Sequence, residues 1–164
     1  MTENVSERQD AVNVAPHTPA GEAFTDLVVQ VFRLNGALVA AGDALAKPAG
    51  QTSARWKLLA AIENGPATVA EIARVFGLAR QSVQRVADLL VEDELAVYRD
   101  NPRHRRAKLL ALTPAGGKVI RKIQSAQREW ANRLGAQVGE DSLRRGVASL
   151  ATVMEALEDL GEDE

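Results

Sequence analysis

One stretch of the chain, VAEIARVFGLARQSVQRVADLL (residues 69–90), restricts the fold more than any other. Two short helices that cross closely need a small residue at the crossing point, which Ala73 supplies. Four residues later the turn needs a residue that tolerates positive φ, and Gly77 has no Cβ to oppose it. The second helix must then bury branched apolar side chains, which fits Val83, Val86 and Leu90. We also expect three apolar residues to complete this core: Ile72, Phe76 and Leu78.

This spacing predicts a helix–turn–helix, although any antiparallel helix pair with a glycine turn would satisfy the same positions. The segment that follows favours the first interpretation. The runs LAVYR (95–99) and AKLLAL (107–112) flank a loop and have the character of two hairpin strands. From Arg99 to Lys108 there are five Arg or Lys and one acid, although the whole chain carries a net charge of −2. A basic hairpin directly after the second helix is typical of a winged helix–turn–helix.

The flanking segments are predicted to be long helices, about 22–46, from Thr113 as N-cap onward, and about 142–160. Thr52 and Thr68 are further N-cap candidates, and Glu71 stands at the capping-box spacing from Thr68. We therefore predict a mainly α fold with a small β-hairpin wing. The expected organisation is a flexible arm (1–20), a winged helix–turn–helix domain (51–113), a helical platform (21–50 and 114–160) and an acidic tail (161–164). The platform helices are more apolar than one small core requires, which indicates a partner surface.

Composition excludes several classes of function. Cysteine is absent, so disulfides, thiolate nucleophiles and iron–sulfur clusters are excluded. His17 and His104 are far apart and have no metal-ligand spacing. PAGGKV lacks the complete phosphate-loop pattern, and no catalytic set is present, so we expect neither an enzyme nor a cofactor or metal. We see no apolar run near the ~20 residues of a membrane span and no signal peptide, which favours the cytoplasm.

The second helix should present polar groups outward, which suggests DNA as the partner. With its apolar side chains turned inward, its N-terminal half offers amide, hydroxyl and guanidinium groups that suit base edges and phosphates. Its C-terminal half, from Asp88 on, is acidic and would be repelled. We expect insertion into a major groove through the first turns. The predicted contacts of this helix are Arg80 (to phosphate), Gln81, Ser82, Gln84 and Arg85.

The basic loop should then lie beside the duplex. We predict DNA contacts from Arg103, Arg105 and Arg106, and a phosphate contact at a helix N-terminus from Thr68. The alternatives are an ordinary solvated polar face, and arginines that pair with the protein's own acids, such as Asp88 or Glu92. For Arg106 the two interpretations are evenly balanced.

The segment GPATVAEIARVFGLARQSVQRVADLLVEDELAVYRDNPRHRRAKLLALTPAG resembles the core of the MarR (multiple antibiotic resistance regulator) transcription factors. The resemblance extends more weakly over about 22–160. It implies a homodimer whose first and last helices interlock, bound to a pseudo-palindromic operator on double-stranded DNA. It also implies a repressor that a small, often aromatic, anion releases from DNA.

The chain departs from the family pattern in two places. The usual wing sequence Asp-Pro-x-Asp-Arg-Arg becomes Asn-Pro-Arg-His-Arg-Arg, so Asn101 and His104 replace the two acids. Ala79 stands where a serine or threonine cap is common, which costs about 1 kcal/mol of capping. These changes support an alternative function, a winged-helix protein-interaction module that has lost sequence-specific DNA binding.

A pocket for an effector would lie between platform and winged domain. We name four candidates for its lining: Arg33, Arg55, Trp56 and Trp130. The alternative for both tryptophans is packing in the core or in a dimer interface.

Overall fold

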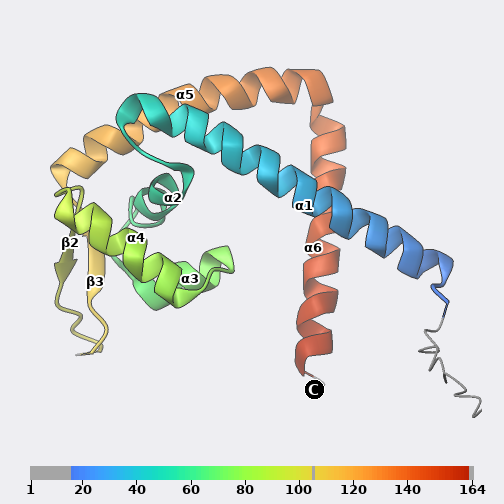
Figure 1. Cartoon of the computed structure of the whole chain (residues 1–164), viewed down its shortest axis with the longest axis horizontal. Coiled ribbons are helices and arrows are strands. Elements are labelled where there is room, and N and C mark those ends of the chain that lie inside the picture. The colour runs from blue at the N-terminus through green and yellow to red at the C-terminus, as the bar shows by residue number, and fades with distance from the viewer. Residues whose placement is uncertain (1–15, 105, 163–164) are drawn as a thin grey trace, which may run out of the picture. The chain divides into compact units, whose positions relative to one another are not determined.

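The structure is a computed structural model that describes residues 16–104 and 106–162 (Figure 1). The chain divides into two compact units, residues 1–39 and 40–164. Most of the predicted N-terminal arm, the wing residue Arg105 and the last two residues of the acidic tail lie outside the described residues.

The described part of the first unit is the larger portion of α1 (Pro19–Ala46). Many large apolar side chains of this helix are exposed: Phe24, Val29, Val31, Phe32, Leu34 and Leu38. The segment Pro19–Ala49 is long and apolar enough to cross a membrane, with mean hydropathy 1.3 over its 18-residue window. The expectation that the chain holds no such run was therefore wrong, because the charged residues of α1 are too few to lower its hydropathy.

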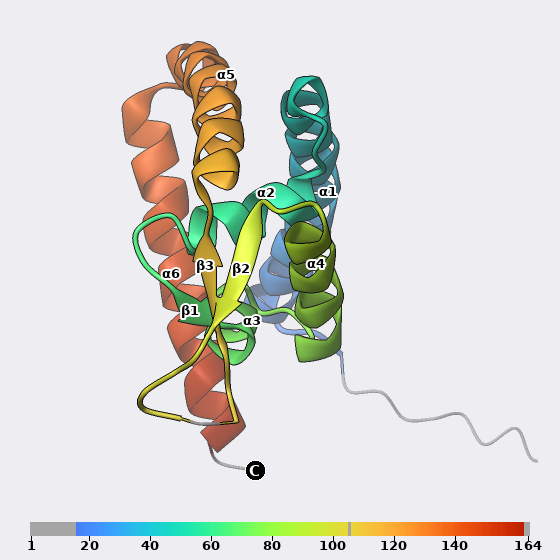
Figure 2. The same ribbon diagram turned by 90° about the vertical axis from the view of Figure 1, so that its left-hand side faces the viewer.

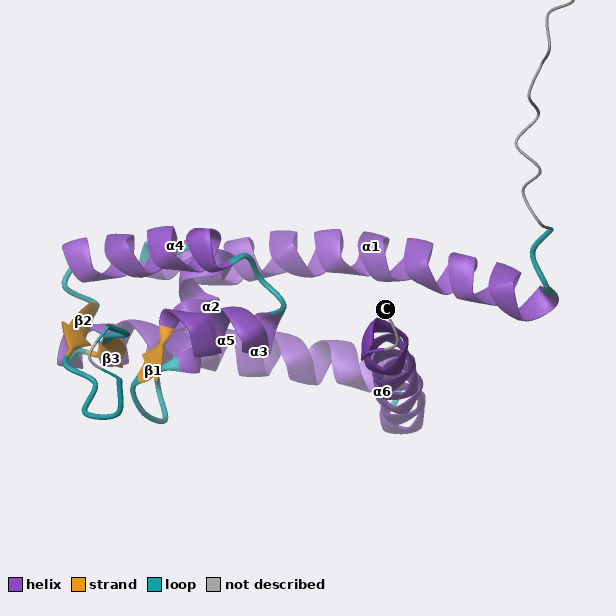
Figure 3. Cartoon of the chain, turned by 90° about the horizontal axis from the view of Figure 1, so that it is seen from below, coloured by secondary structure: helices purple, strands orange, loops and turns teal. Residues whose placement is uncertain are grey.

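The second unit contains the remaining elements, with a short 3₁₀ helix, η1, after the end of α1. They are η1 (Lys47–Ala49), α2 (Ser53–Ala61), β1 (Ala67–Thr68), α3 (Val69–Phe76), α4 (Arg80–Glu92), β2 (Ala96–Arg99), β3 (Leu109–Leu112), α5 (Pro114–Val138) and α6 (Glu140–Glu162). In Figure 3 the three short strands lie together beside α3. The predicted mainly α fold with a helix–turn–helix and a small wing is confirmed.

Most helix boundaries follow the local signals in the sequence. Thr52 Oγ1 accepts a hydrogen bond from the backbone N–H of Arg55, and Thr113 Oγ1 accepts one from Gly116. Thr68 and Glu71 form the complete capping box. Gly77 ends α3 in the left-handed region at φ 61°, where a residue without Cβ is favoured. Each of these caps was predicted, because each depends on residues within one helical turn of it.

The three strands form an antiparallel sheet in the order β1-β3-β2. The predicted hairpin is confirmed, with Ala96 opposite Leu112 and Arg99 opposite Leu109. Strand β1 was not predicted, because two residues carry no hydrophobic alternation. Figure 2 shows the β2–β3 loop extending from the end of the sheet opposite to α5.

The core of the second unit lies between α2, α3, α4 and the sheet. Its fully buried large side chains include Leu58, Leu59, Ile62, Ile72, Val83, Leu90, Leu110 and Ile120. Phe76 and Leu78 were expected in this core, but they are 38% and 40% exposed. They stand at the last residue of α3 and in the turn that follows it. Val86 is half-buried, because Ala87 occupies the inward position between Val83 and Leu90 on α4.

The start of α5 is packed tightly against the turn before β2. A Cβ at Gly116 would lie 2.1 Å from the backbone oxygen of Leu95, so that position has room only for glycine. Further along α5, Lys122 Nζ donates a 2.6 Å hydrogen bond to the backbone oxygen of Pro48 in η1. These contacts fix α5 to the turn before β2 and to η1.

Beyond Gly139 the chain continues as α6, which has no residue in the buried class among its described positions. Its large apolar side chains recur at three- and four-residue steps and are exposed: Leu143, Val147, Leu150, Met154, Leu157 and Leu160. An apolar stripe of this length on a described helix lacks a partner within the second unit.

Candidate nucleic-acid interface

A hollow of about 360 Å³ brings together the start of α3, the start of α4 and the base of the wing. Its lining includes four residues predicted from the sequence to contact DNA: Thr68, Arg80, Gln84 and Arg106. Lys108 and Tyr98 also line it, and neither was predicted from the sequence as a site residue. Residues from three separate segments thus border one basic hollow.

A second hollow of about 540 Å³ follows the outer face of α4. It is lined by Arg80, Gln81, Gln84, Arg85, Asp88, Leu89 and Glu92. Ser82 is exposed on the same helix but lines neither hollow. Positive charge stands in the first turns of α4 and negative charge in the last, so an approaching phosphate is attracted to one end only.

The first turn of α4 has no side-chain cap. Ala79 occupies the N-cap position and makes no side-chain hydrogen bond there. The leading N–H groups of a helix have no partner within the helix, and without a cap they are left to water or to an anion. The uncapped N–H groups therefore lie at the end of α4 that carries Arg80.

Thr68 is already engaged by its own helix. Its backbone N–H donates to Glu71 Oε2 at 2.7 Å, and its hydroxyl donates to the same oxygen at 2.8 Å. These two hydrogen bonds lower the pKa of Glu71, with smaller contributions from the charges of Arg74 and Arg103. A phosphate contact from the Thr68 N–H or hydroxyl would have to displace the Glu71 carboxylate.

Tyr98 on β2 is tied to two residues of α4. Tyr98 Oη donates to Asp88 Oδ1 at 2.8 Å and accepts from Gln84 Nε2 at 2.7 Å. Burial, and then Asp88, raises the pKa of Tyr98 to about 12. This contact was not predicted because Tyr98 and Gln84 are 14 positions apart. Tyr98 lies on the same side of β2 as the buried Ala96, so the strand pattern marks it as inward-facing.

The wing loop begins with a turn built by Asn101. Its Oδ1 accepts from the backbone N–H of Arg103 at 3.0 Å, and its backbone oxygen accepts from His104 at 3.1 Å. Arg103, His104 and Arg106 are exposed. Among the described residues no ion pair joins Arg103 or Arg106 to an acid, so the alternative in which they pair with Asp88 or Glu92 finds no support. Arg105 lies outside the described residues.

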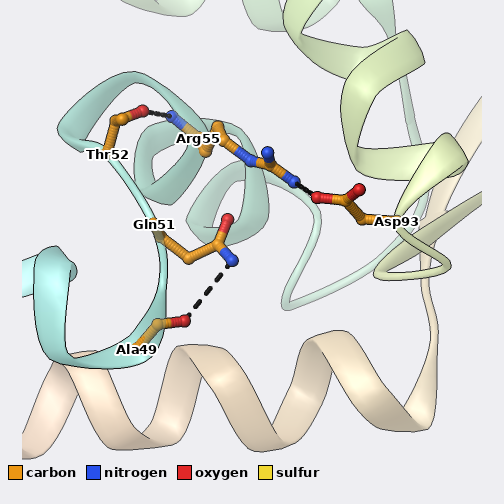
Figure 4. A network of polar contacts seen from close by, with 5 residues as sticks. All are labelled: Ala49, Gln51, Thr52, Arg55 and Asp93. Atoms are coloured by element: carbon orange, nitrogen blue, oxygen red, sulfur yellow. Dashed lines mark hydrogen bonds and ion pairs between the residues drawn. The ribbon is translucent and has the colours of Figure 1, made fainter.

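The four proposed effector-binding residues do not gather in either of these hollows. Arg55 forms an ion pair with Asp93 at the end of α4 (Figure 4). Trp56 packs against the hydrophobic core, Trp130 is half-buried on α5, and Arg33 belongs to the first unit. Two buried polar atoms near this ion pair, Gln51 Oε1 and Arg55 Nε, have no hydrogen-bond partner.

Residues 16–104 and 106–162 contain no group of three or more His, Asp or Glu side chains placed to hold a metal ion.

Comparison with known proteins identifies similar chains. A model of the MarR family matches residues 49–107. The uncharacterized protein Rv2011c of Mycobacterium tuberculosis is 41% identical over 131 residues, which cover 76% of this chain and 92% of that protein. The M. tuberculosis regulator MosR, solved in complex with DNA, is 26% identical with a TM-score of 0.66, over 79% of this chain and 96% of that one. CouR from Rhodococcus jostii RHA1, bound to p-coumaroyl-CoA, is 19% identical with a TM-score of 0.70, over 78% and 91% of the two chains, and shares the fold.

Proposed function

This chain belongs to the MarR family of transcriptional regulators, and from that premise we propose that it is a cytoplasmic, homodimeric repressor that binds a pseudo-palindromic DNA operator. The proposed contacts are the first turns of α4 in the major groove and the wing arginines beside them. The proposed signal is a small, anionic and often aromatic effector that releases the protein from DNA.

One observation carries the DNA-binding proposal. The basic hollow joins Arg80 and Gln84 of α4 to Arg106 and Lys108 of the wing. Two basic segments separated in sequence by the acidic end of α4 thus face one space, which suits a phosphate backbone better than a neutral ligand. The similarity to MosR, which was solved with DNA, supports the same interpretation.

The homodimer is proposed from the exposed apolar side chains of α1 and α6. Side chains such as Phe32, at 71% exposure, and Val147, at 69%, are unfavourable in water over so long a surface. A second copy of the chain would cover them through a two-fold interface. In this proposal the apolar composition of α1 serves subunit association and not membrane insertion.

The effector is proposed by similarity to the family and to CouR with its bound p-coumaroyl-CoA. The unpartnered atoms Gln51 Oε1 and Arg55 Nε give the most specific place to look for it. Titration of the protein–DNA complex with salicylate, a small aromatic anion, should release DNA in the wild type and less readily in Arg55→Met. Equal release in both proteins would exclude Arg55 as an effector contact.

A gel-shift titration with the DNA upstream of the protein's own gene tests the proposed function. We expect a discrete complex that unlabelled specific duplex displaces and a scrambled duplex of equal length does not. Binding that the scrambled duplex displaces equally well, or no complex at all, would favour the protein-interaction module instead.

A further inference from the structure

A closed ring of hydrogen bonds joins the proposed recognition helix to the wing sheet. Gln84 Nε2 lies 2.9 Å from Asp88 Oδ1 and 2.7 Å from Tyr98 Oη, and Tyr98 Oη lies 2.8 Å from Asp88 Oδ1. Two of these residues belong to α4 and the third to β2. The ring therefore restrains one side chain of the DNA-reading face from outside its own helix.

The chemistry of the three groups determines the direction of each hydrogen bond. An ionised carboxylate only accepts, so both neighbours of Asp88 must donate to it. Tyr98 gives Asp88 its single hydroxyl hydrogen, and the Gln84 atom facing Asp88 must be the amide nitrogen. The oxygen of Tyr98 then accepts from the same amide nitrogen. Both hydrogen bonds of this side chain involve Nε2, and neither engages Oε1.

Gln84 also occupies a particular place on the surface. Arg80 and Gln84 line both hollows, the basic one toward the wing and the one along the outer face of α4. Gln84 is exposed although its nitrogen is engaged. Its side chain thus stands on the ridge between the two hollows, where a base edge would come within reach of Oε1.

We propose that this ring makes Gln84 a pure hydrogen-bond acceptor toward DNA, with Tyr98 as the positioning residue that sets this polarity. The inference rests on the proposed function and adds a rule of sequence recognition to it. In the major groove an acceptor matches the amino group of adenine or cytosine and is repelled by O6 of guanine and O4 of thymine. A free glutamine amide instead prefers adenine, because it pairs with N6 and N7 together.

The wild type should therefore select adenine or cytosine at one position of each half-site, without strong discrimination between them. Tyr98→Phe removes the acceptor of one amide hydrogen, which Gln84 can then donate to N7 of adenine. We expect this variant to favour adenine over cytosine at that position by about fivefold or more. Asp88→Ala removes the other acceptor of the Gln84 amide and should also shift the preference toward adenine. This second variant tests the proposal even if Tyr98→Phe does not fold.

The test is selection of bound duplexes from a randomised pool by the full chain, followed by sequencing. Gln84→Ala identifies the position concerned, because its base preference should be lost there. Gln137→Ala, an exposed amide on α5 that lines neither hollow, is the matched control and should leave the ratio of adenine to cytosine at that position unchanged. Circular dichroism establishes that each variant is folded.

The outcomes separate the two proposals. A wild-type chain that enriches no sequence contradicts the proposed function. A wild-type motif with guanine or thymine at the Gln84 position overturns the acceptor rule while the proposed function stands. An unchanged ratio of adenine to cytosine in folded Tyr98→Phe and Asp88→Ala also overturns it. A shift to adenine in both supports it.

Discussion

Single residues on α4 decide which bases the proposed interface reads. Arg85 is exposed on the outer face of this helix and lines the hollow there. Its guanidinium is free to make a bidentate contact, since no ion pair holds it within the described part of the chain. The proposed role is thus one of base recognition and not of folding.

Replacing Arg85 with Ala should weaken operator binding by about 1–3 kcal/mol and relax sequence choice at one or two base pairs. Gel-shift titrations with the operator and its single-base variants measure both effects. Arg128→Ala removes the same charge from an exposed position on α5 and serves as the control. An Arg85→Ala protein that binds with wild-type affinity at moderate salt would exclude this residue from the interface.

Glu71 connects folding stability to pH. Hydrogen bonds from Thr68 hold the pKa of Glu71 below its ordinary value of 4.5, so its contribution to stability is complete above that pH. The contribution is lost as the pH falls through the lowered pKa, because the folded state must then give up the capping carboxylate. We expect Glu71→Gln to reduce the loss of stability between neutral pH and pH 3 relative to wild type. Urea midpoints across this range measure it, and Glu129→Gln on α5 should leave the wild-type profile in place.

At the scale of elements, the junction between the wing and α5 depends on the close approach of Gly116 to the backbone oxygen of Leu95. A methyl group at Gly116 would meet a backbone oxygen at 2.1 Å, whereas one at Gly117 meets the flexible end of the Arg121 side chain at 3.3 Å. The two positions are adjacent on the same helix, so a substitution at each separates steric conflict from helix propensity.

Gly116→Ala should lower the free energy of unfolding by about 3 kcal/mol, since backbone must move to admit the methyl group. Gly117→Ala should be near neutral or stabilising by up to about 1 kcal/mol, because alanine favours a helix interior. Urea denaturation followed by circular dichroism compares the two. Equal stability of both variants would contradict the close packing of α5 on the Leu95 turn.

In the proposed interface, the wing contributes to DNA binding through the positive charge of its arginines. Removing one arginine that binds a phosphate should reduce the slope of log K against log salt by about 0.9. The double variant Arg103→Ala, Arg106→Ala is expected to lower that slope by the equivalent of two phosphates in each protomer, while the preferred sequence stays the same. Binding measured from low to moderate salt tests this, and an unchanged slope would remove these two arginines from the interface.

At the scale of the whole molecule, the exposed stripe on α6 is expected to hold two copies together. Met154, at 61% exposure, lies within the stripe. Thr152 lies on the opposite side of the same helix, because two residues correspond to about 200° of rotation. A charge introduced at Met154 tests the proposed interface, and the same charge at Thr152 controls for any effect on the folding of α6 itself.

Met154→Glu should give a monomer in gel filtration. Its operator affinity should fall by at least about a hundredfold, because the two half-sites must then be bound by two separate monomers. Thr152→Glu should remain dimeric and bind the operator as the wild type does. A wild-type protein that is monomeric without DNA or detergent would refute the homodimer.

Signals confined to one helical turn were sufficient to predict much of this protein. The Thr68 and Glu71 capping box, the left-handed Gly77 and the Thr113–Pro114 start of α5 each depend on neighbours within four residues. Backbone geometry alone brings those groups together, so the helix–turn–helix and the start of α5 follow from the sequence. The hairpin followed in the same way from two apolar runs around a polar loop.

Contacts between distant segments were decided by the tertiary structure. Phe76 and Leu78 are apolar yet exposed, at the end of α3 and in the turn that follows it. Arg55 meets Asp93 across 38 positions, and Tyr98 meets Gln84 across 14. No local pattern records such pairs, since the first depends on how α2 packs against α4 and the second on how β2 packs against α4. The sequence by itself determined which elements form and where charge gathers; the packing of β2 against α4 decided which atoms of that charged surface remain free to bind.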